Sequence, residues 1–132
     1  MAGVLVAFTT AAAAQPAPPV YPSKPIRFIV PYAAGGSVDP LVRIFTPKMT
    51  EGLGQQVVVD IRPGGNTVIG TDALAKSPPD GHTILATVVT NHVINALLIP
   101  NLPFDSVKDF APVSTVSSTD YVLVLHPSVP AK

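Results

Sequence analysis

The sequence predicts an α/β fold with a parallel sheet, because a unit of strand, glycine-rich turn and helix occurs twice and a third strand follows. Continuous apolar runs at 26–30 and 57–59 are typical of strands that are buried on both faces. An order of strand, helix, strand, helix, strand needs crossover connections. Such connections place the strands parallel and pack the helices on the sheet.

The first helix is expected soon after the strand at 26–30. Asp39 suits the N-cap and Pro40 suits the first helical position. Pro47 should kink the helix, and the glycines at 52 and 54 should end it. Apolar side chains with the spacing of one helical face follow the cap: Leu41, Ile44, Phe45 and Met49, with Lys48 among them.

The remaining elements follow in the same alternation. The turn at 62–70, RPGGNTVIG, joins the second strand to a helix over 68–76, and a tight turn at 78–81 precedes the third strand. After it the sequence predicts, in order, a strand at 83–89, a polar turn at 90–92, a short helix ending near Pro100, a single turn at 106–110, and strands at 113–116 and 121–125.

Three polar turns are expected at one edge of the sheet, because each follows the carboxyl end of a parallel strand. Ligands of such sheets bind at this edge. The first turn contains Gly35, Gly36 and Ser37. Glycine lets the backbone approach a ligand, and the first amides of a helix point outward with a partial positive charge. The turn therefore suits a small anion, although its glycines equally suit a sharp turn alone. The position of Asp39 at the start of the expected helix favours a role as helix cap over a role as catalytic carboxylate.

Composition excludes several classes of function. Eight basic and eight acidic residues give a net charge of zero, so the chain offers no footprint for a nucleic acid or an anionic membrane. Cysteine is absent, which excludes disulfides, thiolate nucleophiles and zinc–cysteine sites. The glycine turns lack the pattern of a nucleotide loop, and the three histidines, at 82, 92 and 126, lack the spacing of metal ligands. We expect no metal and no cofactor.

A catalytic reading depends on residues that almost any chain supplies. Ser37, His92 and Asp39 can be combined into a hydrolase triad only on paper, because the G-x-S-x-G turn that presents such a serine is missing. The sequence therefore predicts a protein that is not an enzyme, with a hydrolase as the disfavoured alternative.

The N-terminal segment at 1–22 is treated separately from the fold. Residues 2–14 are apolar or small and end in AAAAQ, which resembles the end of a secretory signal peptide, and a proline-rich lead-in follows. No Lys or Arg precedes the run, so a flexible tail stays open as an alternative. The run is shorter than the roughly 20 residues of a membrane-spanning helix.

Four long segments, in the same order, resemble the periplasmic solute-binding proteins of tripartite tricarboxylate transporters, the TctC or Bug family. They are KPIRFIVPYAAGGSVDPLVRIFTPKM, VVVDIRPGGNTVIGTDALAKSPPDGHTIL, NHVINALLIPNLPFDSVKDFAPVSTV and VLVLHPSVPA, so that the match runs from about Tyr21 to Lys132. The resemblance implies a type II-like, two-lobed binding protein of the Gram-negative periplasm. Such proteins close on small mono- or dicarboxylates and deliver them to membrane transporter subunits.

The resemblance also implies where the carboxylate binds. In this family backbone amides and small polar side chains of the loops after the first and third strands hold it. Carried over, these are Tyr32, Ala33, Gly35, Gly36, Ser37 and Asp39 in the first loop and Thr90 and Asn91 in the third, with Gly64, Gly65, Asn66 and Thr67 of the second loop as weaker candidates. A neutral chain can bind an anion when helix N-termini supply the donors.

Members of the family that the chain resembles are much longer, so we expect this chain to correspond to only part of such a protein. Residues 23–120 correspond to a partial first lobe, and residues 121–132 to a strand that crosses toward a second lobe. We expect a truncated chain that holds one wall of the site. A remnant of a truncated gene that binds nothing is the alternative. One wall cannot exclude water from a ligand as a closing pair of lobes does.

Overall fold

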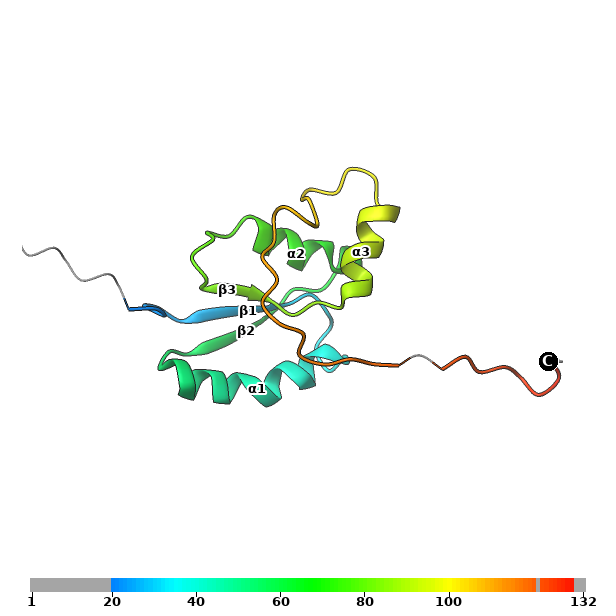
Figure 1. Cartoon of the computed structure of the whole chain (residues 1–132), viewed down its shortest axis with the longest axis horizontal. Helices are drawn as coiled ribbons and strands as arrows, with labels where there is room; N and C mark the ends of the chain where they lie inside the picture. The colour runs from blue at the N-terminus through cyan, green and yellow to red at the C-terminus, as the bar shows by residue number, and fades with distance from the viewer. Residues whose placement is uncertain (1–19, 121, 130–132) are drawn as a thin grey trace, which may run out of the picture.

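The computed structural model describes residues 20–120 and 122–129, and it confirms the parallel sheet. Three strands lie in the order β2-β1-β3: β1 is Ile26–Val30, β2 is Val57–Ile61 and β3 is Thr83–Leu85. Both neighbours run parallel to β1, with Phe28 opposite Val59 on one side and Ile84 on the other. The carboxyl ends of all three strands therefore meet at one edge (Figure 1).

Helices cover both faces of this sheet. Helix α1 is Val38–Leu53, a 3-10 turn η1 spans Gly65–Thr67, α2 is Val68–Ala75 and α3 is Val89–Leu98. Figure 1 shows α1 and α2 on opposite sides of the sheet, with α3 beside its carboxyl edge. Within the described ranges no helix is long and apolar enough to cross a membrane. The signal-like residues 1–19 lie outside those ranges.

The main core lies between β1 and α1. Its buried members are Ile26, Phe28, Val30, Val42 and Val57, and the ring of Phe28 meets Phe45 edge to face at 5.5 Å. The expected apolar face of α1 was partly wrong, because Ile44 is 74% exposed. The side chains that pack on the sheet are Val38, Val42, Phe45 and Met49, which follow the helical repeat along a line next to Ile44.

The start of α1 also differs from the expectation. The helix begins at Val38, with Ser37 as the N-cap residue and no capping bond from its side chain. Asp39 is therefore a residue of the first turn rather than the cap. Its carboxylate reaches back to the amide of Gly35 instead of forward into the helix. The helix continues through Pro47 and ends, as expected, at Gly54, which adopts φ 67°.

The third strand is shorter than expected, which moves the third polar turn. The amide of Ala86 donates the last ladder bond, to the carbonyl of Ile29 at 3.0 Å, and α3 begins at Val89. Thr90 and Asn91 consequently lie in the first turn of α3 and not in a turn before it. The apolar residues that suggested a strand up to 89 belong to the connection and to the helix.

The strands expected at 113–116 and 121–125 were wrong for the residues that the structure describes. Residues 111–120 and 122–129 form no strand, whereas residues 106–108 form the expected turn. Val113 is 89% exposed and Leu123 is 87% exposed. An extended apolar segment becomes a strand only when a neighbour pairs with its backbone, and no described strand lies beside this one.

Candidate functional site

The candidate site consists of the loops that leave the three strands at the carboxyl edge of the sheet. The first loop, 31–37, joins β1 to α1; the second, 62–67, joins β2 to α2; the third, 86–88, joins β3 to α3. Their common position follows from the parallel sheet, as the sequence predicted. What these loops can bind depends on which of their polar groups are already paired.

Most polar groups at the glycine pair of the first loop are paired within the loop. The amide of Gly35 donates to Asp39 Oδ2 at 2.9 Å, and the amide of Gly36 donates to the carbonyl of Ala33 at 3.1 Å. Gly35 has φ 77°, and a Cβ on Gly36 would lie 3.0 Å from the Ala33 carbonyl oxygen. Both positions therefore require glycine for the turn itself.

Asp39 stabilises this turn as a buried carboxylate with 5% exposure. The Gly35 amide lowers its pKa below the ordinary 3.8, and Arg43 adds to this through a bond from its Nε to Asp39 Oδ1 at 2.7 Å, while burial opposes both. Because Arg43 neutralises the charge, the carboxylate does not by itself repel an anion. The groups left to face a ligand include the exposed Ser37 and the Val38 amide, which has no intrahelical acceptor.

The second loop has an unusual backbone. Gly64, Gly65, Asn66 and Thr67 all have positive φ, at 119°, 55°, 51° and 76°. Glycine and asparagine tolerate this region, but a β-branched threonine rarely occupies it. Thr67 is buried whereas Asn66 is exposed, so the loop presents one side chain to solvent and one to the protein.

Side chains join the three loops into one surface. The Tyr32 hydroxyl of the first loop accepts the amide of Val88 at 3.0 Å, just before α3. Asn91 donates from Nδ2 to Asn66 Oδ1 of the second loop at 3.4 Å. Thr90 is exposed in the same first turn of α3 and forms no side-chain bond among the described residues. The structure thus brings the sequence-predicted residues of all three loops to one edge, while their contact with a ligand stays a prediction.

Asn95 is a residue that sequence reasoning missed. It is 2% exposed, and its side chain bonds to both Asn66 and Thr67 of the second loop. Its spacing could have identified it, because Asn95 lies four residues after Asn91 and therefore on the same face of α3.

The hypothetical triad is not assembled. A ring nitrogen of His92, Nε2, bonds to the carbonyl of Ser106 at 2.7 Å, and the oxygens of Asp39 bond to Gly35 and Arg43. No hydrogen bond links Ser37 to either residue in the part of the chain that the structure describes. Among those residues there is also no group of three His, Cys, Asp or Glu side chains placed to hold a metal ion.

A wide hollow of about 2100 Å³ opens beside the first and third loops. Ser37, Val38 and Thr90 line it together with Phe28 and Phe45, and the lining extends along β3 to the turn at 78–81 and to the segment 111–119. Small-molecule sites usually enclose roughly 300–1,000 Å³. The hollow is therefore too large to enclose a small ligand on all sides.

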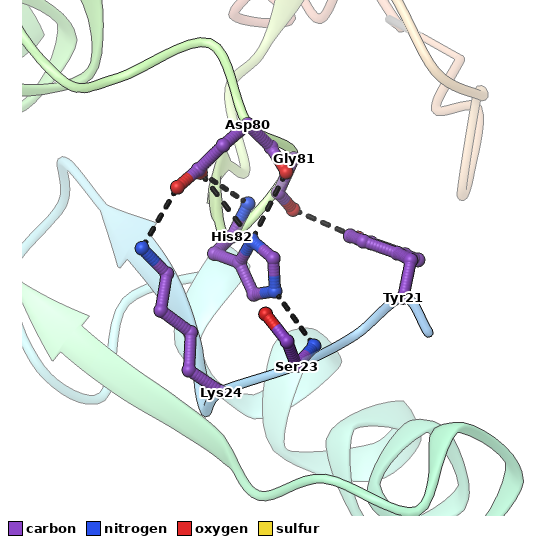
Figure 2. Close-up of polar contacts among 6 residues, drawn as sticks. All are labelled: Tyr21, Ser23, Lys24, Asp80, Gly81 and His82. Atoms are coloured by element: carbon purple, nitrogen blue, oxygen red, sulfur yellow. Dashed lines mark hydrogen bonds and ion pairs between the residues drawn. The ribbon is translucent and has the colours of Figure 1, made fainter. Parts of the chain in front are cut away.

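A second polar cluster lies at the opposite edge of the sheet, before β1 and β3 (Figure 2). The Nε2 of His82 accepts the amide of Ser23 at 3.1 Å, so its proton lies on Nδ1, which faces the Asp80 carbonyl at 3.0 Å. Lys24 pairs with Asp80 at 2.7 Å, and the Tyr21 hydroxyl donates to the Gly81 carbonyl at 2.8 Å. These groups pair with one another, so the cluster attaches residues 21–24 to the 80–82 turn.

Acid is expected to weaken this attachment. The bond from Lys24, followed by that from the His82 amide, lowers the pKa of Asp80 from 3.8 to about 2. A carboxylate whose pKa is lowered by folding stabilises the fold above the unfolded value, and the effect disappears as the pH falls through the folded value. Asp80→Asn should therefore lower the urea midpoint more at pH 7 than at pH 2, where the folded carboxyl group is already partly protonated. Asp120→Asn is the matched exposed control and should have no effect at either pH; an equal effect of Asp80→Asn at both pH values would contradict the assignment.

Comparison with known proteins gives matches of one kind. The model of the family described as tripartite tricarboxylate transporter family receptor matches residues 41–132. A UPF0065 protein from the tcbD-tcbE intergenic region of a Pseudomonas species is 42% identical over 125 residues, which are 95% of this chain and 37% of that protein. BugT of Bordetella pertussis is 40% identical over 128 residues, which are 96% of this chain and 39% of that protein.

Solved structures agree with these matches. MatC of Rhodopseudomonas palustris, solved with bound malate, is 31% identical with a TM-score of 0.66 over 70% of this chain and 32% of that chain. A second protein of that organism, solved with adipate, is 30% identical with a TM-score of 0.61 over 65% of this chain and 29% of that chain. The chain thus spans about a third of the length of these relatives.

Proposed function

The chain belongs to the tripartite tricarboxylate transporter receptors, a family of solute-binding proteins, and on this premise we propose that its three loops form one wall of a site for a small carboxylate. The observation that carries the proposal is the likeness to MatC, a protein solved with malate, over 70% of this chain. At 31% identity and a TM-score of 0.66, MatC shares both the fold and the family of this chain. The adipate-bound structure supports the same class of ligand.

The local chemistry supports an anion at the first loop. Ser37 supplies an exposed hydroxyl, and the Val38 amide supplies a donor at the positive end of α1. Arg43 already neutralises Asp39, and Tyr32 holds the first loop against the start of α3. The wall therefore offers donors without a net charge. We propose binding without catalysis, because the chain belongs to a family of solute-binding proteins.

The proposal extends to compartment and partners. One similar solved structure is described as a periplasmic transporter, and the matching family is described as a transporter receptor, which supports a periplasmic binding protein that delivers its ligand to membrane subunits. A chain with no net charge fits a small-molecule ligand better than a polyanion.

Titration of the ¹⁵N-labelled chain tests the ligand class. Malate and adipate should shift the amide signals of Ser37 and Val38 and leave those of Ile26 and His82, at the far edge, unchanged. The neutral diamide of malate is the control ligand and should shift none of them. Ser37→Ala should weaken binding about 10-fold or more, as expected for loss of one hydrogen bond to a charged group, whereas Ser23→Ala at the opposite edge should not.

A chimera provides the second arm. Residues 31–98 are placed in the matching part of MatC, and binding of dicarboxylates is measured by calorimetry. Heat that disappears on Ser37→Ala supports the proposed wall. Absence of shifts in the chain together with absence of heat in the folded chimera would contradict it, and would favour a chain that binds no carboxylate.

A further inference from the structure

We propose that Asn95 is a positioning residue, which holds the second loop in its left-handed conformation and joins that loop to α3. Its consequence for ligand binding rests on the proposed function, because the second loop belongs to the same wall. Three observations support this role: the strained backbone of the loop, the complete pairing of the Asn95 amide, and the bond from Asn91 to the same loop residue, Asn66.

The strain is concentrated at one residue. Gly64 and Gly65 adopt positive φ without steric cost, and Asn66, at φ 51°, lies in the region that asparagine tolerates best. Thr67, at φ 76°, is β-branched and crowds its own backbone there. Such a conformation persists only when the surrounding structure holds it.

Asn95 supplies that hold through every polar atom of its side chain. Its Nδ2 donates to the Asn66 carbonyl at 2.6 Å and to the Thr67 hydroxyl at 3.2 Å. Its Oδ1 accepts from Asn66 Nδ2 at 2.6 Å. The orientation of the amide is unambiguous, because a backbone carbonyl can only accept and therefore faces the NH₂ group.

The same contacts explain why an amide is needed. An aspartate has the size of Asn95 but no donor when ionised, so one of its oxygens would face the Asn66 carbonyl without a hydrogen bond, whereas the Thr67 hydroxyl can turn and donate to it. Thr71 adds a second contact, since its hydroxyl donates to the Thr67 carbonyl at 2.9 Å. That bond restrains only the helix side of Thr67. On the other side of Thr67, Asn95 bonds to the backbone carbonyl and the side chain of Asn66.

The link also connects the loops to each other. Asn91, one helical turn before Asn95, donates to Asn66 Oδ1. A displacement of α3 therefore reaches the second loop through two side chains. A ligand that contacts the first turn of α3 would therefore affect the position of Asn66. The bonds from Asn95 determine how tightly Asn66 is coupled to α3.

Amide hydrogen exchange tests the hold without any ligand. The Val68 amide donates to the Gly65 carbonyl and so reports on the loop, whereas the Ile26 amide, bonded to the Gln56 carbonyl, reports on the sheet. Asn95→Asp should accelerate exchange at Val68 tenfold or more and leave Ile26 within twofold of the parent. Asn101→Asp, the same change at an exposed turn residue, should alter neither.

A pair of variants at Thr67 separates positioning from general stability. Thr67→Gly removes the steric cost of positive φ together with the hydroxyl that Asn95 contacts, whereas Thr67→Ala removes the hydroxyl and keeps a Cβ at positive φ. Asn95→Asp should therefore accelerate Val68 exchange less in the glycine background than in the alanine background. Equal acceleration in both backgrounds, equal acceleration at Ile26, or none at Val68 would overturn the role of Asn95. Weaker carboxylate binding by Asn95→Asp is expected as well, but failure of ligand binding alone would count against the proposed function and not against this hold.

Discussion

Gly70→Ala is expected to lower the free energy of unfolding by about 1–3 kcal/mol, the usual cost of overpacking a close-packed site. Gly70 is buried in α2, and a Cβ there would lie 2.7 Å from Pro31 Cβ and 3.0 Å from the Arg62 carbonyl oxygen. Both neighbours are rigid, because one is a proline ring and the other is backbone. Alanine improves helix propensity by about 1 kcal/mol, which is too little to offset the contact.

The clash at Gly70 also concerns the candidate site. Pro31 begins the first loop and Arg62 begins the second, so a movement that admits the methyl group displaces α2 or one of these loops. Gly52→Ala is the matched control, because Gly52 lies in α1 with no atom within 4 Å of the position that a Cβ would take, and it should gain about 0.5–1 kcal/mol. Urea unfolding of both variants measures the difference. Equal midpoints for the two would contradict the close approach of α2 to the loops.

Ile26→Ala is expected to cost about 2–5 kcal/mol, because it removes a large buried side chain and leaves a cavity. Ile26 is 1% exposed at the start of the central strand and belongs to the core under α1. The loss acts on the sheet that carries all three loops. Thermal unfolding followed by circular dichroism should show a clearly lower midpoint, or an unfolded chain at room temperature.

Ile44→Ala is the control for this core. Ile44 carries the same side chain but is 74% exposed on α1, and alanine is the better helix former there, so stability should change by less than about 0.5 kcal/mol. If Ile44→Ala destabilised the chain as much as Ile26→Ala, then Ile44 would face the core as its sequence spacing suggested, and the orientation of α1 on the sheet would be wrong.

The sequence predicted the parts of the fold that depend on local pattern. The apolar runs at 26–30 and 57–59 became neighbouring parallel strands, and Gly54 ended α1 with a positive φ as a helix-terminating glycine does. The shared edge of the three loops followed from the order of elements alone. Each of these depends on residues close together in the sequence, or on a topological rule.

The errors concern features that depend on distant partners. The third strand ends at Leu85 because its pairing with β1 ends there, and the residues at 113–116 form no strand because no described neighbour pairs with them. Ile44 had the spacing of a buried residue, but the line of contact with the sheet passes through Val42 and Phe45. Apolar character shows that a residue can be buried, and only packing decides which residues are.

By itself, the sequence determined an α/β chain without net charge whose glycine turns leave parallel strands at one edge, because periodicity and turn chemistry are local properties. The tertiary structure alone decided which groups at that edge are already paired. The Asp39 carboxylate accepts a hydrogen bond from the Gly35 amide, and the Asn95 side chain donates one to the backbone carbonyl of Asn66. Ser37 stays exposed. The physical reason is that a hydrogen bond between segments 29 residues apart, such as that from Asn95 to Asn66, exists only after the chain has brought them together.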